Sequence, residues 1–253
     1  MVEYVNTTYP DYINNPAIIG RSLSQYKVLA RDYKERLDAV LVREAGRITY
    51  RQYKDDDDNY YIHMKVPSEV VPKFYYDVIV KFKKSVINRF KSTLNDYDVQ
   101  FFSNDPAFCF TYSYAFNKNK LLIEDFASKI GKDFLEHKAV TMNPKNSIGP
   151  VKSLYFAYYI MQNKKLFDKK NWEKTIPYKA SSLLKNIMKA EEKIHLRQRY
   201  QKAIQHREKQ SNPTAIPTPI QQSTPPHITK ASGTIKYTKT AKVTKRAKTV
   251  KKK

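Results

Sequence analysis

The sequence has little of several residues on which catalytic and metal sites depend. It contains one cysteine, Cys109, and five glycines among 253 residues. A single thiol cannot close an internal disulfide and has no second cysteine with which to form a zinc knuckle. Cys109, within the apolar segment DPAFCFTYSYAF, is therefore predicted to be a small buried hydrophobe. Few glycines leave little from which to build a phosphate-wrapping loop, and neither G-x-x-x-x-G-K-[ST] nor G-x-G-x-x-G occurs.

Long apolar runs are also missing. The most apolar stretch, VKSLYFAYYIM, carries a lysine and is far shorter than the roughly 18 to 20 residues of a membrane-spanning helix. The N-terminal segment MVEYVNTTYPDYINN lacks the basic and apolar regions of a signal peptide. We therefore predict no membrane partner and synthesis in the cytoplasm.

No catalytic motif is present. G-x-S-x-G is absent, and no histidine stands in an H-E-x-x-H pattern. His63 is interpreted as a cross-strand surface residue. Carboxylates with nearby lysines on strand-like segments are a weak indication of a metal-dependent nuclease, which we do not favour. Those candidates are Asp77, Asp96, Asp98 and Glu124, with Lys81 and Lys120. We expect no enzymatic activity and no cofactor.

A long helix is predicted near the N-terminus. Asn15 suits its N-cap, Pro16 its first position and Gly46 its end. The stripe along it has alternating four- and three-residue spacing, typical of a coiled-coil seam or, as we favour, of a helix lying along its own domain. Its tyrosines suit an interface as well as a core. The stripe comprises Ile19, Leu23, Tyr26, Ala30, Tyr33, Leu37 and Val40.

A β-hairpin follows, because RITYRQY alternates with period two and YYIHMKV has strand composition. The connecting KDDDDN invites a calcium interpretation, with Asp55, Asp57 and Asn59 at alternate positions. However, an EF-hand loop needs a glycine at its sixth place and a glutamate at its twelfth, where Tyr60 and Val66 stand. We therefore favour a solvated loop.

The rest of the body alternates strand-like and helix-like segments. KFYYDVIVKF, DYDVQFF and AFCFTYSYAF are predicted strands, and KKSVINRFKSTLN is predicted to be a short helix. Residues 121–138, the segment VKSLYFAYYIMQNKKLF and residues 181–209 have helical spacing, the last projecting beyond the body. The predicted class is α+β: a small mixed or mainly antiparallel sheet with a long N-terminal helix and C-terminal helices.

Composition divides the chain into three parts. Residues 1–210 are the predicted folded domain, and residues 211–229, rich in Pro, Ser, Thr and Gln, are a linker. Residues 230–253, the basic tail, hold ten of the lysines and arginines and no acid, and are predicted to be disordered when free. Because the chain carries a net charge of +23, the body alone keeps 23 − 10 = +13. Such an excess attracts anions, above all nucleic acid.

Lysines recur every third residue in the basic tail, a period that matches the polyproline II helix and aligns them on one edge. Lysines on phosphates release counterions and carry no base information, so salt-sensitive, nonspecific binding is expected. A merely solubilising tail, an acidic protein partner and a lipid surface are the alternatives. The predicted nucleic-acid contacts are Lys236, Lys239, Lys242, Lys245, Arg246, Lys248, Lys251, Lys252 and Lys253.

The segments YYIHMKVPSEVVPKFYYDVIVKF and YDVQFFSNDPAFCFTYSYAFNKN, with few glycines, one cysteine and a Lys/Thr/Pro tail, carry a general likeness. In style and composition the chain resembles virion structural proteins of tailed bacteriophages, of the neck, connector or tail-completion type. The resemblance implies a place between larger virion partners or copies of itself, with the basic tail near packaged DNA. It also implies synthesis in the host cytoplasm.

Three functions follow from the sequence. The leading hypothesis is a non-enzymatic assembly protein, a phage neck or connector component, whose basic tail contacts nucleic acid. The second is a stand-alone, nonspecific nucleic-acid-binding protein. The third, a metal-dependent nuclease, depends on Asp77 or Asp98.

Overall fold

The computed structural model describes residues 7–17, 21–44, 46–172 and 174–211, with side chains as far as residue 207. These residues belong to one compact unit that ends at Asn212. The predicted linker beyond Ser211 and the basic tail lie outside the described residues.

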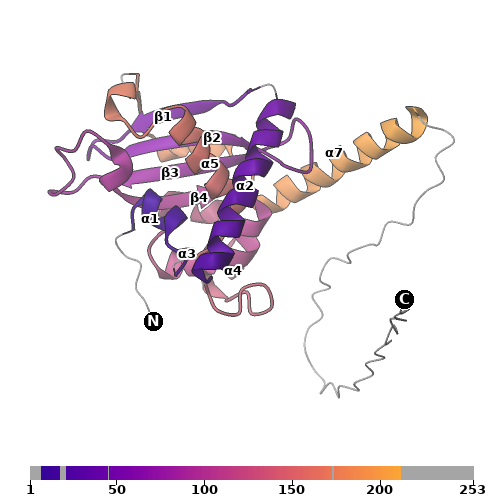
Figure 1. The fold of residues 1–253 in the computed structure, drawn as a ribbon, viewed down its shortest axis with the longest axis horizontal. Coiled ribbons are helices and arrows are strands. Elements are labelled where there is room, and N and C mark those ends of the chain that lie inside the picture. The colour runs from indigo at the N-terminus through magenta and orange to yellow at the C-terminus, as the bar shows by residue number, and fades with distance from the viewer. Residues whose placement is uncertain (1–6, 18–20, 45, 173, 212–253) are drawn as a thin grey trace, which may run out of the picture. The chain divides into compact units, whose positions relative to one another are not determined.

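A five-stranded mixed sheet forms the centre of the body (Figure 1), in the order β4-β3-β2-β1-β5. The four longer strands pair antiparallel with their neighbours, and the two-residue β5 pairs parallel to β1. The predicted α+β class with a small mixed sheet is therefore confirmed. The strands are β1 (Tyr50–Lys54), β2 (Tyr60–Pro67), β3 (Tyr75–Lys83), β4 (Asp98–Ser103) and β5 (Ile176–Pro177).

The predicted hairpin is β1 and β2, with Tyr53 opposite Tyr61. In the acidic loop that connects them, Asp55 and Asp58 have hydrogen-bond or ion-pair partners. Asp55 accepts hydrogen bonds from the Asn59 backbone N–H (2.8 Å), the Asn59 side-chain amide (2.9 Å) and the Tyr61 hydroxyl (2.8 Å). Asp58, at φ 64°, pairs with Lys54. Residues 56 and 57 form a turn between the two strands.

One face of the sheet is covered by helices α1 (Tyr9–Asn14) and α5 (Lys152–Asn163). The buried ring of Tyr9 lies 5.0 Å from that of Phe101 and 5.1 Å from that of Tyr158, and its hydroxyl donates to the Leu154 carbonyl at 2.6 Å. The high tyrosine content therefore builds a core in which rings pack and hydroxyls bond to backbone. Helix α1 was not predicted from the sequence.

Helix α2 (Leu23–Arg43) lies along the same layer, where Tyr33 packs edge-on against Tyr155 at 5.1 Å. Its predicted start was wrong: Ser22 is the N-cap, because Ser22 and Gln25 form a reciprocal capping box. Leu23 is exposed, whereas Leu37 and Val40 are buried. Ile19 lies outside the described residues. From Tyr26 onward the stripe faces the body, so α2 is a helix of its own domain.

A π-helical turn, η2 (Phe108–Tyr112), runs into α3 (Ser113–Lys118) beside β4, where Phe116 packs against Phe101 at 5.9 Å and Phe108 against Phe102 at 6.4 Å. The predicted strand AFCFTYSYAF was therefore wrong. Asp105 accepts a hydrogen bond from the Ala107 N–H, and Pro106 between them favours a helix start. The helix buries Phe108 and Cys109 against the sheet, as predicted for Cys109.

Two further helix predictions need correction. Residues 84–92 form turns, and the predicted helix from 181 to 209 is two helices, because Ile187 leaves the helical conformation at ψ 121°. Residues 121–138 are only partly helical. The remaining elements are η1 (Leu94–Asp96), η3 (Glu124–Lys129), α4 (Lys132–Glu136), η4 (Lys169–Asn171), α6 (Ala180–Asn186) and α7 (Ala190–Ser211).

The outer edge of the sheet at β4 is closed by short backbone contacts. The Val99 N–H donates to the Thr7 carbonyl (2.9 Å), the Phe101 N–H to Leu121 (2.7 Å), and the Ile123 N–H to Phe101 (3.1 Å). The segments that contain Thr7 and Leu121 therefore satisfy backbone hydrogen-bonding groups of the edge strand β4 without adding a full strand to the sheet.

The Tyr9 contacts give a stability prediction. Replacing Tyr9 with Phe leaves the ring in place but removes the bond to Leu154, and we expect a loss of about 1–2 kcal/mol in the free energy of unfolding. Tyr9→Ala also removes the ring and should cost about 3–5 kcal/mol. Urea unfolding measures both, with the more exposed Tyr50→Phe as control, expected within about 0.5 kcal/mol of wild type. Equal stability of Tyr9→Phe and wild type would contradict the prediction.

Candidate functional site

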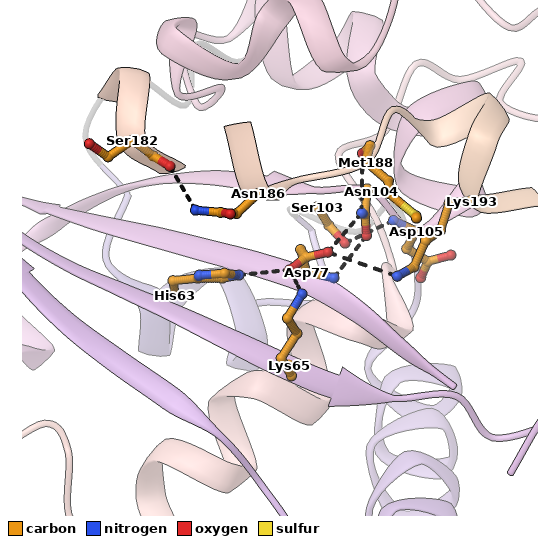
Figure 2. A network of polar contacts seen from close by, with 10 residues as sticks. All are labelled: His63, Lys65, Asp77, Ser103, Asn104, Asp105, Ser182, Asn186, Met188 and Lys193. Carbon is orange, nitrogen blue, oxygen red and sulfur yellow. Dashed lines mark hydrogen bonds and ion pairs between the residues drawn. The ribbon is translucent and has the colours of Figure 1, made fainter. Parts of the chain in front are cut away.

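The most unusual side chain in the sheet is that of Asp77, a buried aspartate in β3 with 1% of its surface exposed. A charged carboxylate is costly to bury unless cations and hydrogen-bond donors surround it. Asp77 meets both conditions, with partners drawn from three separate parts of the chain (Figure 2).

Each oxygen of the Asp77 carboxylate has its own partners. Oδ1 accepts a hydrogen bond from His63 Nε2 at 2.7 Å and pairs with the Lys65 ammonium. Oδ2 accepts from the Asn104 side-chain amide at 2.9 Å and lies 3.9 Å from Lys193 Nζ. His63 and Lys65 are two residues apart on β2, so they point to the same face of the sheet, and Lys65 lies directly opposite Asp77.

The surroundings fix Asp77 in its charged form. Burial alone raises the pKa of this carboxyl, but the hydrogen bond from His63 and the charge and hydrogen bond of Lys65 outweigh it, and the pKa is lowered to about 2. Burial lowers the pKa of Lys193, while the charge of Asp77 acts in the opposite direction. Lys193 also lies 4.9 Å from the Phe74 ring centroid, a cation–π contact.

Asn104 joins the network to the C-terminal helices. Its side-chain oxygen accepts from the Asp77 N–H at 2.8 Å, and its amide also donates to the Met188 carbonyl at 3.3 Å. Met188 lies in the break between α6 and α7, and Lys193 lies in the first turns of α7. The Asp77 network therefore holds the start of α7 against the sheet.

A groove of about 1010 Å³ opens beside this network, between the exposed face of β1 and β2 and the segment from β5 to α6. Four of its lining residues are basic side chains, Arg51, His63, Lys65 and Lys179, and no aspartate or glutamate is among the described residues that line it. Asp77 lies beneath and is paired with both His63 and Lys65, so Arg51 and Lys179 carry the excess positive charge of the groove. We call this the basic groove. Its excess positive charge suits an anionic chain such as a phosphodiester backbone.

The structure does not bring the proposed nuclease carboxylates together. Asp98 lies opposite Lys83, six residues along β3 from Asp77, which at about 3.3 Å per residue is about 20 Å away. Asp96 belongs to η1 and Glu124 to η3. Both oxygens of Asp77 already have protein partners. Among the described residues, these carboxylates belong to no group of three or more histidine, cysteine or carboxylate side chains that could hold a metal ion.

An imidazole held by a carboxylate can also act as a general base. In the part of the chain that the structure describes, no hydroxyl or thiol is hydrogen-bonded to His63, whose bond is to Asp77. The pair therefore orients the imidazole toward the groove without an adjacent nucleophile.

Sequence reasoning found only part of this site. The basic tail, from Lys236 to Lys253, lies outside the described residues. Asp77 was considered only as a nuclease residue, and His63 is mostly buried rather than at the surface. Arg51 and Lys179 were not singled out. One usable signal was present: an aspartate inside the apolar run YYDVIV indicates a buried, paired charge.

Comparisons with protein-family models, with curated proteins and with solved structures found no match to this chain. Within the described residues, no helix has the length and apolar character needed to cross a membrane.

The lowered pKa of Asp77 predicts how stability depends on pH. The carboxylate is ionised more readily in the folded chain, at about 2, than at its ordinary 3.8. Its stabilisation is therefore complete above about pH 5 and is lost as the pH falls toward 2, an effect of about 2 kcal/mol. Urea unfolding from pH 5 to pH 2 should show wild type losing about that much more stability than Asp77→Asn.

At neutral pH Asp77→Asn leaves Lys65 and Lys193 without their buried counter-charge and should cost about 3–5 kcal/mol. Asp38→Asn, at an exposed position of α2, is the matched control and should stay within about 0.5 kcal/mol of wild type. If the free energies of unfolding of wild type and Asp77→Asn change with pH in the same way, Asp77 contributes no pH-dependent stability.

Proposed function

We propose that the protein is a non-enzymatic assembly protein that binds nucleic acid through its basic groove and its basic tail. The observation that carries the proposal is the basic groove: Arg51, His63, Lys65 and Lys179 line a volume of about 1010 Å³, and its described lining includes no carboxylate. A positively charged groove with this composition follows a phosphate backbone without reading bases.

Three features of the groove support a polyanion rather than a compact ligand. Arg51 and Lys179 are exposed and come from opposite walls, so a chain lying between them would contact both. Tyr50, partly exposed on the same strand, offers one ring on which a base could stack. Asn186, whose amide donates to the Ser182 carbonyl at 2.9 Å, adds a fixed polar group.

The basic tail supports the same proposal from the sequence, since its nine predicted contact residues add positive charge to that of the body. The assembly role, as a neck or connector component of a phage virion, is supported by the sequence resemblance. In that setting the body contacts virion partners or further copies of the chain, while groove and tail hold nucleic acid.

The groove is tested by nucleic-acid binding at several salt concentrations. We expect the full chain to bind a single-stranded oligonucleotide with an affinity that falls steeply with salt. Replacing both Arg51 and Lys179 with Gln should remove about two phosphate contacts, weaken binding about equally for unrelated sequences, and reduce the salt slope by about 2. Fluorescence anisotropy of labelled oligonucleotides measures both quantities.

The matched control is Lys27→Gln with Lys34→Gln, which removes the same charge from exposed positions of α2. If this control and the groove variant lose the same affinity, net charge and not the groove determines binding. A chain ending at Asn212 tests the basic tail separately. If that chain does not bind and the full chain does, the tail alone contacts nucleic acid.

A stand-alone nucleic-acid-binding protein is the second candidate, since the same groove would serve it. It differs in having no assembled state, so light scattering on the full chain distinguishes the two. The third candidate, a metal-dependent nuclease, has less support because its carboxylates lie apart.

A further inference from the structure

One wall of the basic groove is joined to the sheet by very little backbone. We call this segment, residues 176–186, the groove wall; it comprises β5, α6 and the residues between them. Strand β5 is only two residues long, and Pro177 has no N–H with which to extend its pairing to β1. Ile176 keeps 44% of its surface exposed. Pairing with β1 therefore contributes little to holding the groove wall in place.

The side chain of Tyr178 supplies the missing attachment. Its ring stacks on that of Tyr61 in β2, with the two centroids 3.8 Å apart and the two planes 10° from parallel. Tyr61 is 2% exposed, so it offers a fixed surface against which the second ring packs. The backbone N–H of Tyr178 also donates to the Lys54 carbonyl at 2.8 Å. Together these contacts fasten the start of the groove wall to β1 and β2.

The hydroxyl groups of both rings are fixed as well. The Tyr178 hydroxyl donates to Asp125 of η3 at 2.7 Å, and the Tyr61 hydroxyl donates to Asp55 at 2.8 Å. Burial, and then the hydrogen bond to Asp125, raise the pKa of Tyr178, so its hydroxyl remains a donor at neutral pH. Neither aspartate is among the described residues that line the basic groove. The attachment therefore adds no negative charge to the lining.

The other end of the groove wall is held by different contacts. Just beyond it, the Met188 carbonyl accepts from the Asn104 side-chain amide at 3.3 Å. Lys179, the basic residue that the wall contributes to the lining, directly follows Tyr178 in the chain and is far in sequence from Met188. The contacts of Tyr178, and not those of Met188, therefore decide where Lys179 lies.

We propose that Tyr178 is the positioning residue of the basic groove: by stacking on Tyr61 it keeps Lys179 on the wall opposite Arg51, so that one nucleic-acid strand contacts both cations. This inference deepens the proposed function and depends on it. Without the stack, the two-residue β5 would leave the sheet and Lys179 would move with it. Arg51 would stay in place, because it belongs to β1. Binding should then lose one of the two phosphate contacts.

Salt titrations of oligonucleotide binding to the full chain test the proposal. Tyr178→Ala should reduce the slope of log binding constant against log salt by about 1, the effect of one lost phosphate contact. Tyr178→Phe keeps the stacked ring without its hydroxyl and should restore most of that slope. Tyr114→Ala, at a partly exposed tyrosine of α3, is the matched control and should keep the wild-type slope.

Double variants separate positioning from a general loss of stability. Lys179→Gln alone should reduce the salt slope by about 1. Added to Tyr178→Ala, it should reduce the slope no further, because Lys179 has already left the groove. Arg51→Gln should reduce the slope by about 1 with or without Tyr178→Ala. If Lys179→Gln is as effective in Tyr178→Ala as in wild type, other contacts hold the groove wall and the proposal is overturned.

Hydrogen exchange measured by mass spectrometry tests the attachment without nucleic acid. Residues 176–186 should exchange faster in Tyr178→Ala than in wild type, while β2 should exchange at the wild-type rate. Unchanged exchange of the groove wall would overturn the proposal. If Tyr178→Ala does not fold, Tyr178→Leu, which keeps an apolar side chain without the ring, replaces it in every measurement.

The two measurements also distinguish failure of this inference from failure of the proposed function. If wild type binds and Tyr178→Ala keeps its salt slope, the groove stands and the role of Tyr178 is wrong. If wild type binds no oligonucleotide, the proposed function is wrong and Tyr178 positions no binding residue, whatever the exchange of the groove wall.

Discussion

The ionised carboxylate of Asp77, held inside the sheet, is the constraint on which the arrangement of the C-terminal helices depends. Its partners come from β2, from the residue after β4 and from α7, so one buried charge fixes three segments that are remote in sequence. Because an unpaired buried charge is far more costly than a paired one, these segments are held together as a set. The same contacts hold Met188, just after α6, and Lys193 at the start of α7 close to the basic groove.

The elements predicted correctly are those with a local pattern. The β1–β2 hairpin, β3 and β4 follow from alternation and β-rich composition, and α5 from an apolar helical face. The errors share a different cause. The segment AFCFTYSYAF has strand composition, but burial of Phe108 and Phe116 between the sheet and neighbouring turns makes it helical. Residues 84–92, predicted to belong to a short helix, form turns in which Val86, Ile87 and Phe90 are exposed.

The candidate site was harder to predict because its parts are brought together only by tertiary structure. Arg51 and Lys179 meet across the groove only because the two-residue β5 pairs with β1, a contact that composition does not indicate. Strand register decides which cations face Asp77, and register depends on the whole sheet. The charge excess of the body was visible in the sequence, whereas its concentration in a groove was not.

The closed edge at β4 has a consequence for aggregation at high protein concentration. An open strand edge is a template on which other chains can add strands, which leads to edge-to-edge aggregation and eventually to amyloid-like stacking. Here the carbonyls of Thr7 and Leu121 accept hydrogen bonds from the β4 backbone N–H groups that such growth would use. Because these groups are already hydrogen-bonded, chains that meet at high concentration can touch through side chains at this edge but cannot add a strand to it.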